Sequence, residues 1–300
     1  MPISKSTDLG NAVVLSKHLW PLQVAGVEMP AGIHTSRSIV YCGLAIVGFA
    51  NGASERIARA IDEKGVLAAF YDTFGVSTVV WAALLSGIWL LLRSDPQPIR
   101  RIDIAIAASA AVAFLLPIPA LSWLAITLIA THLAFSSRST DLERRAGAVL
   151  GAATVPMLWA RILFAGMSNS ILVADAKLVG WLVGTKSQGN VIPFADGSGM
   201  LFLEPACSSL TNVSLAYLCG VLFLKIYDRS WSLSAIKTIA IACFATIALN
   251  VIRISSICLF PRYYDEIHGQ LGATLAGWAT MAVVLAIYIR GIKPNATARA

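Results

Sequence analysis

The stretch SAIKTIAIACFATIALNVIRISSIC, residues 234–258, decides the fold of this chain. It holds a single lysine and a single arginine, and it exceeds the length of about 20 mainly apolar residues that a helix needs to cross a bilayer. Comparable apolar blocks recur in both directions along the chain. They predict transmembrane helices at about 37–52, 66–92, 102–116, 119–136, 146–166, 207–226, 234–258 and 270–290.

The composition agrees with a membrane protein. Hydrophobic residues make up 57% of the 300 residues and charged residues only 13%, which is about half the charged share of a soluble domain. The predicted fold class is therefore all-α, a polytopic transmembrane bundle of about eight spans in a lipid bilayer. The net charge of +7 does not indicate a nucleic-acid partner, because the basic residues are scattered through short gaps instead of forming one stripe.

The same basic residues predict the orientation. With the N-terminus inside, fifteen of the 23 Lys and Arg residues fall in inside segments and six in outside segments. The positive-inside rule then places both termini in the cytoplasm, and the expected location is the cell inner membrane. Residues 1–36 become a cytoplasmic segment, 37–290 the transmembrane domain and 291–300 a cytoplasmic tail.

One predicted outside segment, about residues 168–206, is much longer than the others. Its first half has apolar residues at helical spacing, which predicts a short helix lying in the membrane interface. Its second half contains two pieces that look extended, 189–193 and 200–203, around a glycine-containing turn. This cap ends directly before Cys207.

Three reactive or charged residues fall at one membrane face in this topology. Cys207 opens the sixth span, Arg253 lies near the outer end of the seventh, and His268 begins the eighth. The dipole at a helix N-terminus favours a thiolate. A thiol, an imidazole and a guanidinium are the nucleophile, the acid–base group and the oxyanion-stabilising cation that a cysteine acyl-transfer enzyme needs. Asn250, on the same helix face as Arg253, and Glu204 would orient them.

Simpler interpretations exist for each residue. A lone cysteine is often a packing residue, Arg253 and Arg161 can snorkel to the interface, and His132 and His268 can be interfacial. A transporter or channel, or a non-catalytic scaffold for envelope polysaccharide export, also stays open, although a transporter would favour inverted repeats and midplane charges, which the sequence does not show. No cluster with metal-ligand spacing is present, and no cofactor is expected.

At these residues the chain resembles the exosortase and archaeosortase family, multi-pass membrane enzymes regarded as cysteine transpeptidases. The resemblance covers about residues 170–290. Two positions depart from the family pattern. The family glycine after Cys-Ser is replaced here by Ser209, and a basic residue often found soon after it is replaced by Thr211. This departure would fit a divergent subgroup with another substrate. The matching motifs are Ala206-Cys207-Ser208, Asn250-Val251-Ile252-Arg253 and His268-Gly269.

The resemblance implies an endopeptidase or transpeptidase that acts at the extracytoplasmic face on a membrane-tethered protein. Family substrates carry a short C-terminal motif, one apolar helix and a basic tail. In that scheme the Cys207 thiolate attacks a peptide carbonyl, His268 protonates the leaving amine, and Arg253 stabilises the oxyanion or the thiolate. Asn250, Glu204 and Ser208 are the expected supporting residues.

Overall fold

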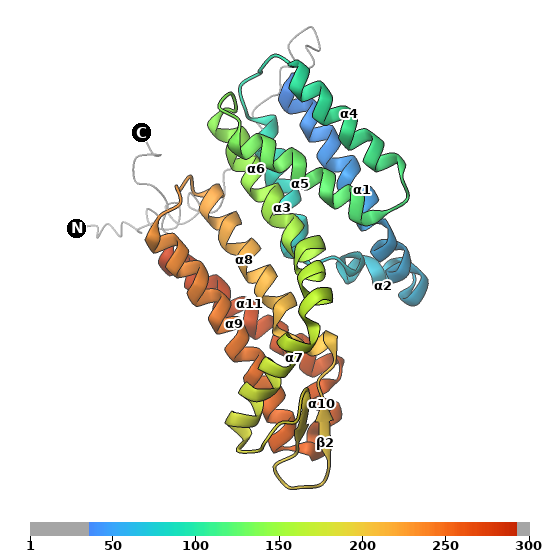
Figure 1. Cartoon of the computed structure of the whole chain (residues 1–300), viewed down its shortest axis with the longest axis vertical. Coiled ribbons are helices and arrows are strands. Elements are labelled where there is room, and N and C mark those ends of the chain that lie inside the picture. The colour runs from blue at the N-terminus through green and yellow to red at the C-terminus, as the bar shows by residue number, and fades with distance from the viewer. Residues whose placement is uncertain (1–35, 293–300) are drawn as a thin grey trace, which may run out of the picture. The chain divides into compact units, whose positions relative to one another are not determined.

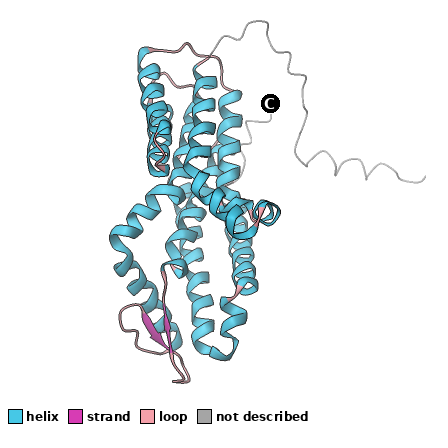
Figure 2. Cartoon of the chain, turned by 90° about the vertical axis from the view of Figure 1, so that its right-hand side faces the viewer, coloured by secondary structure: helices cyan, strands magenta, loops and turns pink. Residues whose placement is uncertain are grey.

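The computed structural model describes residues 36–292, which form an almost entirely helical fold with one small β-hairpin (Figures 1 and 2). The expected cytoplasmic segment 1–36 and tail 291–300 fall almost wholly outside these residues. The helices are α1 (Arg37–Lys64), α2 (Val66–Tyr71), α3 (Thr78–Leu92), α4 (Arg101–Leu115), α5 (Pro119–Phe135), α6 (Asp141–Thr154), α7 (Ala160–Val183), α8 (Ser209–Ile226), α9 (Leu233–Leu259), α10 (Tyr264–His268) and α11 (Gln270–Gly291). The remaining elements are the strands β1 (Val191–Pro193) and β2 (Met200–Phe202), the 3-10 turns η2 (Thr73–Gly75), η4 (Pro205–Cys207) and η5 (Pro261–Tyr263), and the π turn η3 (Val155–Trp159).

Local sequence signals explain where many of these helices begin. A hydroxyl side chain that accepts a hydrogen bond from a free backbone N–H satisfies a donor that the first helical turn cannot pair. Such caps precede α1, α3, α6, α8 and α9, and they are Ser36, Ser77, Thr140, Ser208 and Ser232. Helix α5 instead begins with Pro119, whose fixed φ suits the first helical position.

Helices α6 and α7 are joined through η3 into one segment of 43 residues, Asp141–Val183. The predicted end of a span near 166, followed by a short helix, agrees with a kink at Met167, whose φ of −128° and ψ of 18° are not helical and divide α7 into two helical pieces. Pro156 in η3 has no backbone N–H and therefore cannot make the hydrogen bond of a regular helical turn. The chain forms a π turn at this point and the helix continues. The segment Asp141–Val183 therefore has two irregularities, the π turn and the kink at Met167.

The predicted helix at 66–92 is wrong, because the structure divides it into α2, η2 and α3. Phe74 and Gly75 take positive φ angles of 54° and 67°, which interrupt helical hydrogen bonding. Helix α1 in turn continues well beyond residue 52 and ends at Gly65, with φ 78°. Helices α4 and α5 are separate helices that pack against each other on either side of the predicted break.

Four described segments are long and apolar enough to cross a membrane, which fits an all-α membrane protein. They are Asp141–Val183, Ser209–Ile226, Leu233–Leu259 and Leu271–Gly291. Thr78–Leu92 and Pro119–Phe135 are shorter apolar helices. The span count of about eight is not confirmed by these lengths and remains a prediction.

The helices pack around two hydrophobic cores. The larger core lies among α1, α3, α4, α5, α6 and α8 and extends to α9 and α11. The smaller core joins the C-terminal halves of α7 and α9 to the hairpin, and its members include Leu172, Ile192, Leu203 and Ile257. The two extended pieces expected in the cap are confirmed as an antiparallel pair, with Ile192 opposite Leu201. In Figure 1 the hairpin and α10 lie together near one end of α9.

A buried polar cluster fastens α1 to α4, α5 and α6. The Arg37 guanidinium pairs with Asp103 at 2.8 Å and with Glu143 at 3.1 Å, and all three side chains are almost fully buried. Tyr41 and His132 both reach the Asp103 carboxylate, at 2.9 and 3.0 Å. His132 is thus part of an ionic cluster inside the bundle, which its position in an apolar sequence block did not reveal.

Candidate active site

Cys207 lies in the short turn that connects the hairpin to α8. Its backbone N–H donates to the carbonyl of Glu204 at 2.9 Å, and the next residue, Ser208, caps α8 by accepting a hydrogen bond from the N–H of Leu210 at 3.2 Å. The helix itself starts at Ser209, two residues later than predicted. The half-buried thiol therefore stands just ahead of the positive end of α8, and Ser208 shapes that end.

Two neighbouring helices hold this turn in place. Asn250 of α9 donates from Nδ2 to the Cys207 carbonyl at 2.9 Å and to the Ser209 Oγ at 3.0 Å. Asp175 of α7 accepts from the backbone N–H of Ser209 at 3.0 Å. Asn250, Ser209 and Asp175 are all buried, so these are hydrogen bonds that bulk water does not replace. Asp175 was not predicted, although an acidic residue within an apolar helix was a usable signal.

Arg253 lies one helical turn after Asn250 on α9. Its Nη2 atom is 3.4 Å from the backbone carbonyls of both Ile267 and His268, at the C-terminal end of α10. Its Nε atom is buried and has no hydrogen-bond partner among residues 36–292. A buried guanidinium N–H without an acceptor is a donor that remains available to a ligand.

His268 closes α10 instead of opening the last long helix, which starts after Gly269. Its ring stacks on the ring of Tyr264, one turn earlier, with centroids 5.0 Å apart and planes 11° apart. Tyr264 was not predicted, yet the spacing of four residues from His268 on a helix indicates such a contact. The stacking orients the imidazole.

One small cavity brings these groups together. It has a volume of about 50 Å³, and the predicted residues Glu204, Cys207, Arg253 and His268 all line it. Tyr264 and a set of apolar residues complete the wall. The volume suffices for a few water molecules. Ser208 does not line this cavity, and Asn250 acts behind it through the Cys207 carbonyl.

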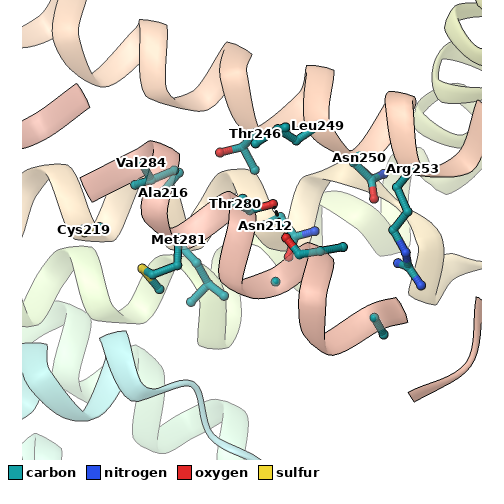
Figure 3. Close-up of a pocket in the computed structure, with 14 residues that line it drawn as sticks. Asn212, Ala216, Cys219, Thr246, Leu249, Asn250, Arg253, Thr280, Met281 and Val284 are labelled. Carbon is teal, nitrogen blue, oxygen red and sulfur yellow. Dashed lines mark hydrogen bonds between the residues drawn. The ribbon is translucent and has the colours of Figure 1, made fainter. Parts of the chain in front are cut away.

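A larger cavity of about 340 Å³ lies between α8, α9 and α11. Arg253 lines both cavities, and Figure 3 shows it at one end of the larger one beside Asn250, with Cys219 and Val284 at the other end. Many of the other lining residues are small, namely Ala216, Ala273, Ala276 and Gly277. Arg253 thus links the Cys207 cavity to an elongated space along the helices.

The part of the chain that the structure describes contains no group of three or more His, Cys, Asp or Glu side chains that would hold a metal ion. The reactive groups that line the small cavity are the thiol of Cys207, the imidazole of His268 and the guanidinium of Arg253.

Comparison with known proteins identifies a family. A family model described as transmembrane exosortase (Exosortase_EpsH) matches residues 68–290. No curated protein and no solved structure matches the chain significantly. The matched region contains Cys207, Arg253 and His268 and covers most of the chain. The protein belongs to the transmembrane exosortase family.

Proposed function

We propose that this protein is a membrane cysteine endopeptidase or transpeptidase that processes the C-terminal sorting signals of membrane-tethered proteins. The observation that carries the proposal is the shared cavity of Cys207, Arg253 and His268, in which a buried Arg253 N–H has no acceptor among the described residues. Family membership supports it, because exosortases are generally membrane cysteine transpeptidases.

The groups act in sequence. As the Cys207 sulfur attacks the peptide carbonyl carbon, the thiol proton passes to His268, and the negative charge that forms on the carbonyl oxygen is stabilised by Arg253. The carbon–nitrogen bond then breaks, and His268 returns the proton to the leaving amine. The resulting thioester is resolved by an incoming amine in transpeptidation or by water in hydrolysis.

The larger cavity is where we place the apolar helix of the substrate. Helices pack closely in membranes where small residues let their backbones approach, and Ala216, Ala276 and Gly277 line this space. Only 11% of the apolar window of α11 is buried, so this helix has a large surface free for a further helix. A substrate helix placed here would bring the segment at its end to Arg253.

The decisive experiment co-expresses the protein with a secreted protein that carries a C-terminal motif, an apolar helix and a basic tail. Cys207→Ala should abolish the size change of that substrate while the enzyme variant still accumulates, because a removed thiol leaves only a small void. Cys243→Ala, in α9, is the matched control and should process normally. Normal processing by Cys207→Ala would rule out thiol catalysis.

A thiol-reactive probe separates this function from a transporter or a non-catalytic scaffold. Only an enzyme of this type requires Cys207 to react faster than an ordinary half-buried thiol. Equal labelling rates for Cys207 and an exposed reference thiol would favour one of those two alternatives.

A further inference from the structure

A third cavity, of about 460 Å³, reaches the turn that carries Cys207 without sharing a lining residue with the Cys207 cavity. It lies among α1, α3, α7 and α8, and Pro205, two residues before Cys207, forms part of its wall. Two arginines line it, Arg56 from α1 and Arg161 from α7, and no acidic residue does. The catalytic scheme above uses neither arginine.

Arg56 and Arg161 differ from the other cations nearby in having no ion-pair partner among residues 36–292. A smaller adjoining cavity is lined by Arg56 and Arg161, by Arg59 and Lys64, and by the carboxylates of Glu55, Glu63 and Asp72. Arg59 pairs with Glu55 at 3.0 Å, and Lys64 pairs with Asp72. Neither Arg56 nor Arg161 has a hydrogen bond or an ion pair with any residue between 36 and 292.

Placing two unpaired guanidinium groups at one cavity is unfavourable. Their charges repel each other, and Arg56 is half-buried, where water screens the repulsion less than it does at an open surface. An anion between them would turn this repulsion into two attractions. A guanidinium offers a planar fork of donors that matches the oxygen atoms of a phosphate group.

The rest of the cavity wall indicates what carries the anion. Val80, Met157, Phe164 and Leu215 give it an apolar surface, and Ser77, Thr211 and Ser214 add hydroxyl groups. Arg161 is exposed on the surface of a segment apolar enough to cross a membrane. Cations next to an apolar wall at a bilayer surface fit an anionic headgroup with attached hydrocarbon chains.

We propose that Arg56 and Arg161 bind the phosphate group of an anionic phospholipid from the surrounding bilayer, whose chains lie against the apolar wall formed by α3, α7 and α8. The bound lipid joins α1 to α7 beside the turn that carries Cys207. This site is independent of peptide processing, so a binding measurement tests it whether or not the protein is a peptidase.

The test uses the full-length protein, purified in a neutral detergent, with lipid binding followed by native mass spectrometry. Phosphatidylglycerol should bind the unmodified protein more tightly than phosphatidylcholine does. Arg56→Gln and Arg161→Gln should each weaken phosphatidylglycerol binding by about tenfold or more, since each removes a charged donor pair. Arg59→Gln is the matched control, because Arg59 has its own carboxylate partner and does not line the cavity of about 460 Å³.

Several results would overturn the proposal. The first is unchanged phosphatidylglycerol binding in the Arg56→Gln, Arg161→Gln double variant. The second is an equal loss of phosphatidylglycerol binding in Arg59→Gln, which would indicate general charge attraction. Inorganic phosphate that competes as well as the lipid does would assign the site to a soluble anion instead. If a glutamine variant is not monodisperse, Arg56→Lys and Arg161→Lys replace it; each keeps the charge, loses the fork and should bind phosphatidylglycerol less tightly than the unmodified protein.

Discussion

The side-chain amide of Asn250 donates a hydrogen bond to the backbone carbonyl of Cys207, with the two atoms 2.9 Å apart. The bond joins residues 43 positions apart in the sequence and fixes the backbone of the nucleophile candidate to α9. Because Arg253 follows one turn later on the same helix, α9 carries both the cation and the anchor of the thiol. The relative position of these two groups therefore depends on a single rigid element.

Asn250→Ala should lower substrate processing by tenfold or more and destabilise the protein by about 1–3 kcal/mol, because it removes the donor to the Cys207 carbonyl and to the buried Ser209 hydroxyl. Processing is followed by substrate size, and stability by thermal unfolding in detergent. Ser256→Ala, on the same helix, is the control, since the Ser256 hydroxyl donates to the Ile252 carbonyl of its own helix. Asn250→Ala activity equal to that of the control would show that the anchor is dispensable.

Arg253→Lys should leave the protein at normal levels in the membrane and lower processing by about a hundredfold, by analogy with the loss of an oxyanion donor. Lysine keeps the charge but lacks the planar guanidinium, whose Nη2 atom donates to both the Ile267 and the His268 carbonyl and whose Nε is a further donor. The measurement is the rate of substrate conversion. Arg262→Lys, in the nearby 3-10 turn, should behave like the unmodified protein. Full activity of Arg253→Lys would return Arg253 to the role of an interfacial anchor.

Gly277→Leu should block processing by filling the cavity proposed for the substrate helix, while a small electrophile still labels Cys207 at the normal rate. A Cβ atom at Gly277 meets nothing within 4 Å, so the added side chain projects into open space without displacing the protein. Gly43→Leu is matched to it, because Gly43 is also in a helix, has equally open surroundings and does not line that cavity. Both readouts come from the same membrane preparation. Normal processing by Gly277→Leu would place the substrate helix elsewhere.

Asp103→Ala should destabilise the protein by about 3–5 kcal/mol, because it removes one partner of a buried ion pair and leaves the charge of Arg37 partly uncompensated. Tyr41 and His132 lose the same acceptor. Thermal unfolding in detergent gives the loss of stability. The control is Asp62→Ala, which alters an exposed carboxylate on α1. Equal melting temperatures for the two variants would show that the cluster contributes little to folding.

The predicted orientation is tested by two reporter fusions. A reporter placed after Arg299 should be cytoplasmic, and one inserted near Gly197 should be extracytoplasmic, because the basic residues gather in the segments assigned to the inside. Gly197 is at the turn of the hairpin, in a left-handed conformation with open surroundings, so an insertion there disturbs little packing. Reporters on the same side would contradict the span count of about eight.

The sequence predicted the parts of the fold that depend on local pattern. Apolar blocks gave most of the long helices near their observed positions, and the hairpin was expected from its two extended pieces. The motifs around Cys207, Arg253 and His268 identified groups that the structure places at one cavity. Their catalytic roles remain predictions, as does the side of the membrane on which they lie.

What the sequence could not give depends on contacts between distant segments. Asp175 and Ser209 meet because α7 passes beside the start of α8, and neither residue has a local pattern that names its partner. The charge on Arg37 is likewise balanced from two other helices, by Asp103 and Glu143. In the sequence, a buried ion pair of this kind looks like two unrelated charges near the ends of apolar blocks.

The π turn η3 holds one residue more than a regular α-helical turn. Deleting one residue within Val155–Trp159 would therefore let the chain close as a regular α-helix, with the later side chains close to their present orientation. Deleting one residue from the α-helix that follows would instead rotate the later side chains by about 100° and turn the Asp175 carboxylate away from Ser209. Among relatives of this protein, loss of one residue in the π turn is thus compatible with the same Asp175 contact, whereas an indel between that turn and Asp175 is expected to be accompanied by a different cap for the helix that follows the nucleophile.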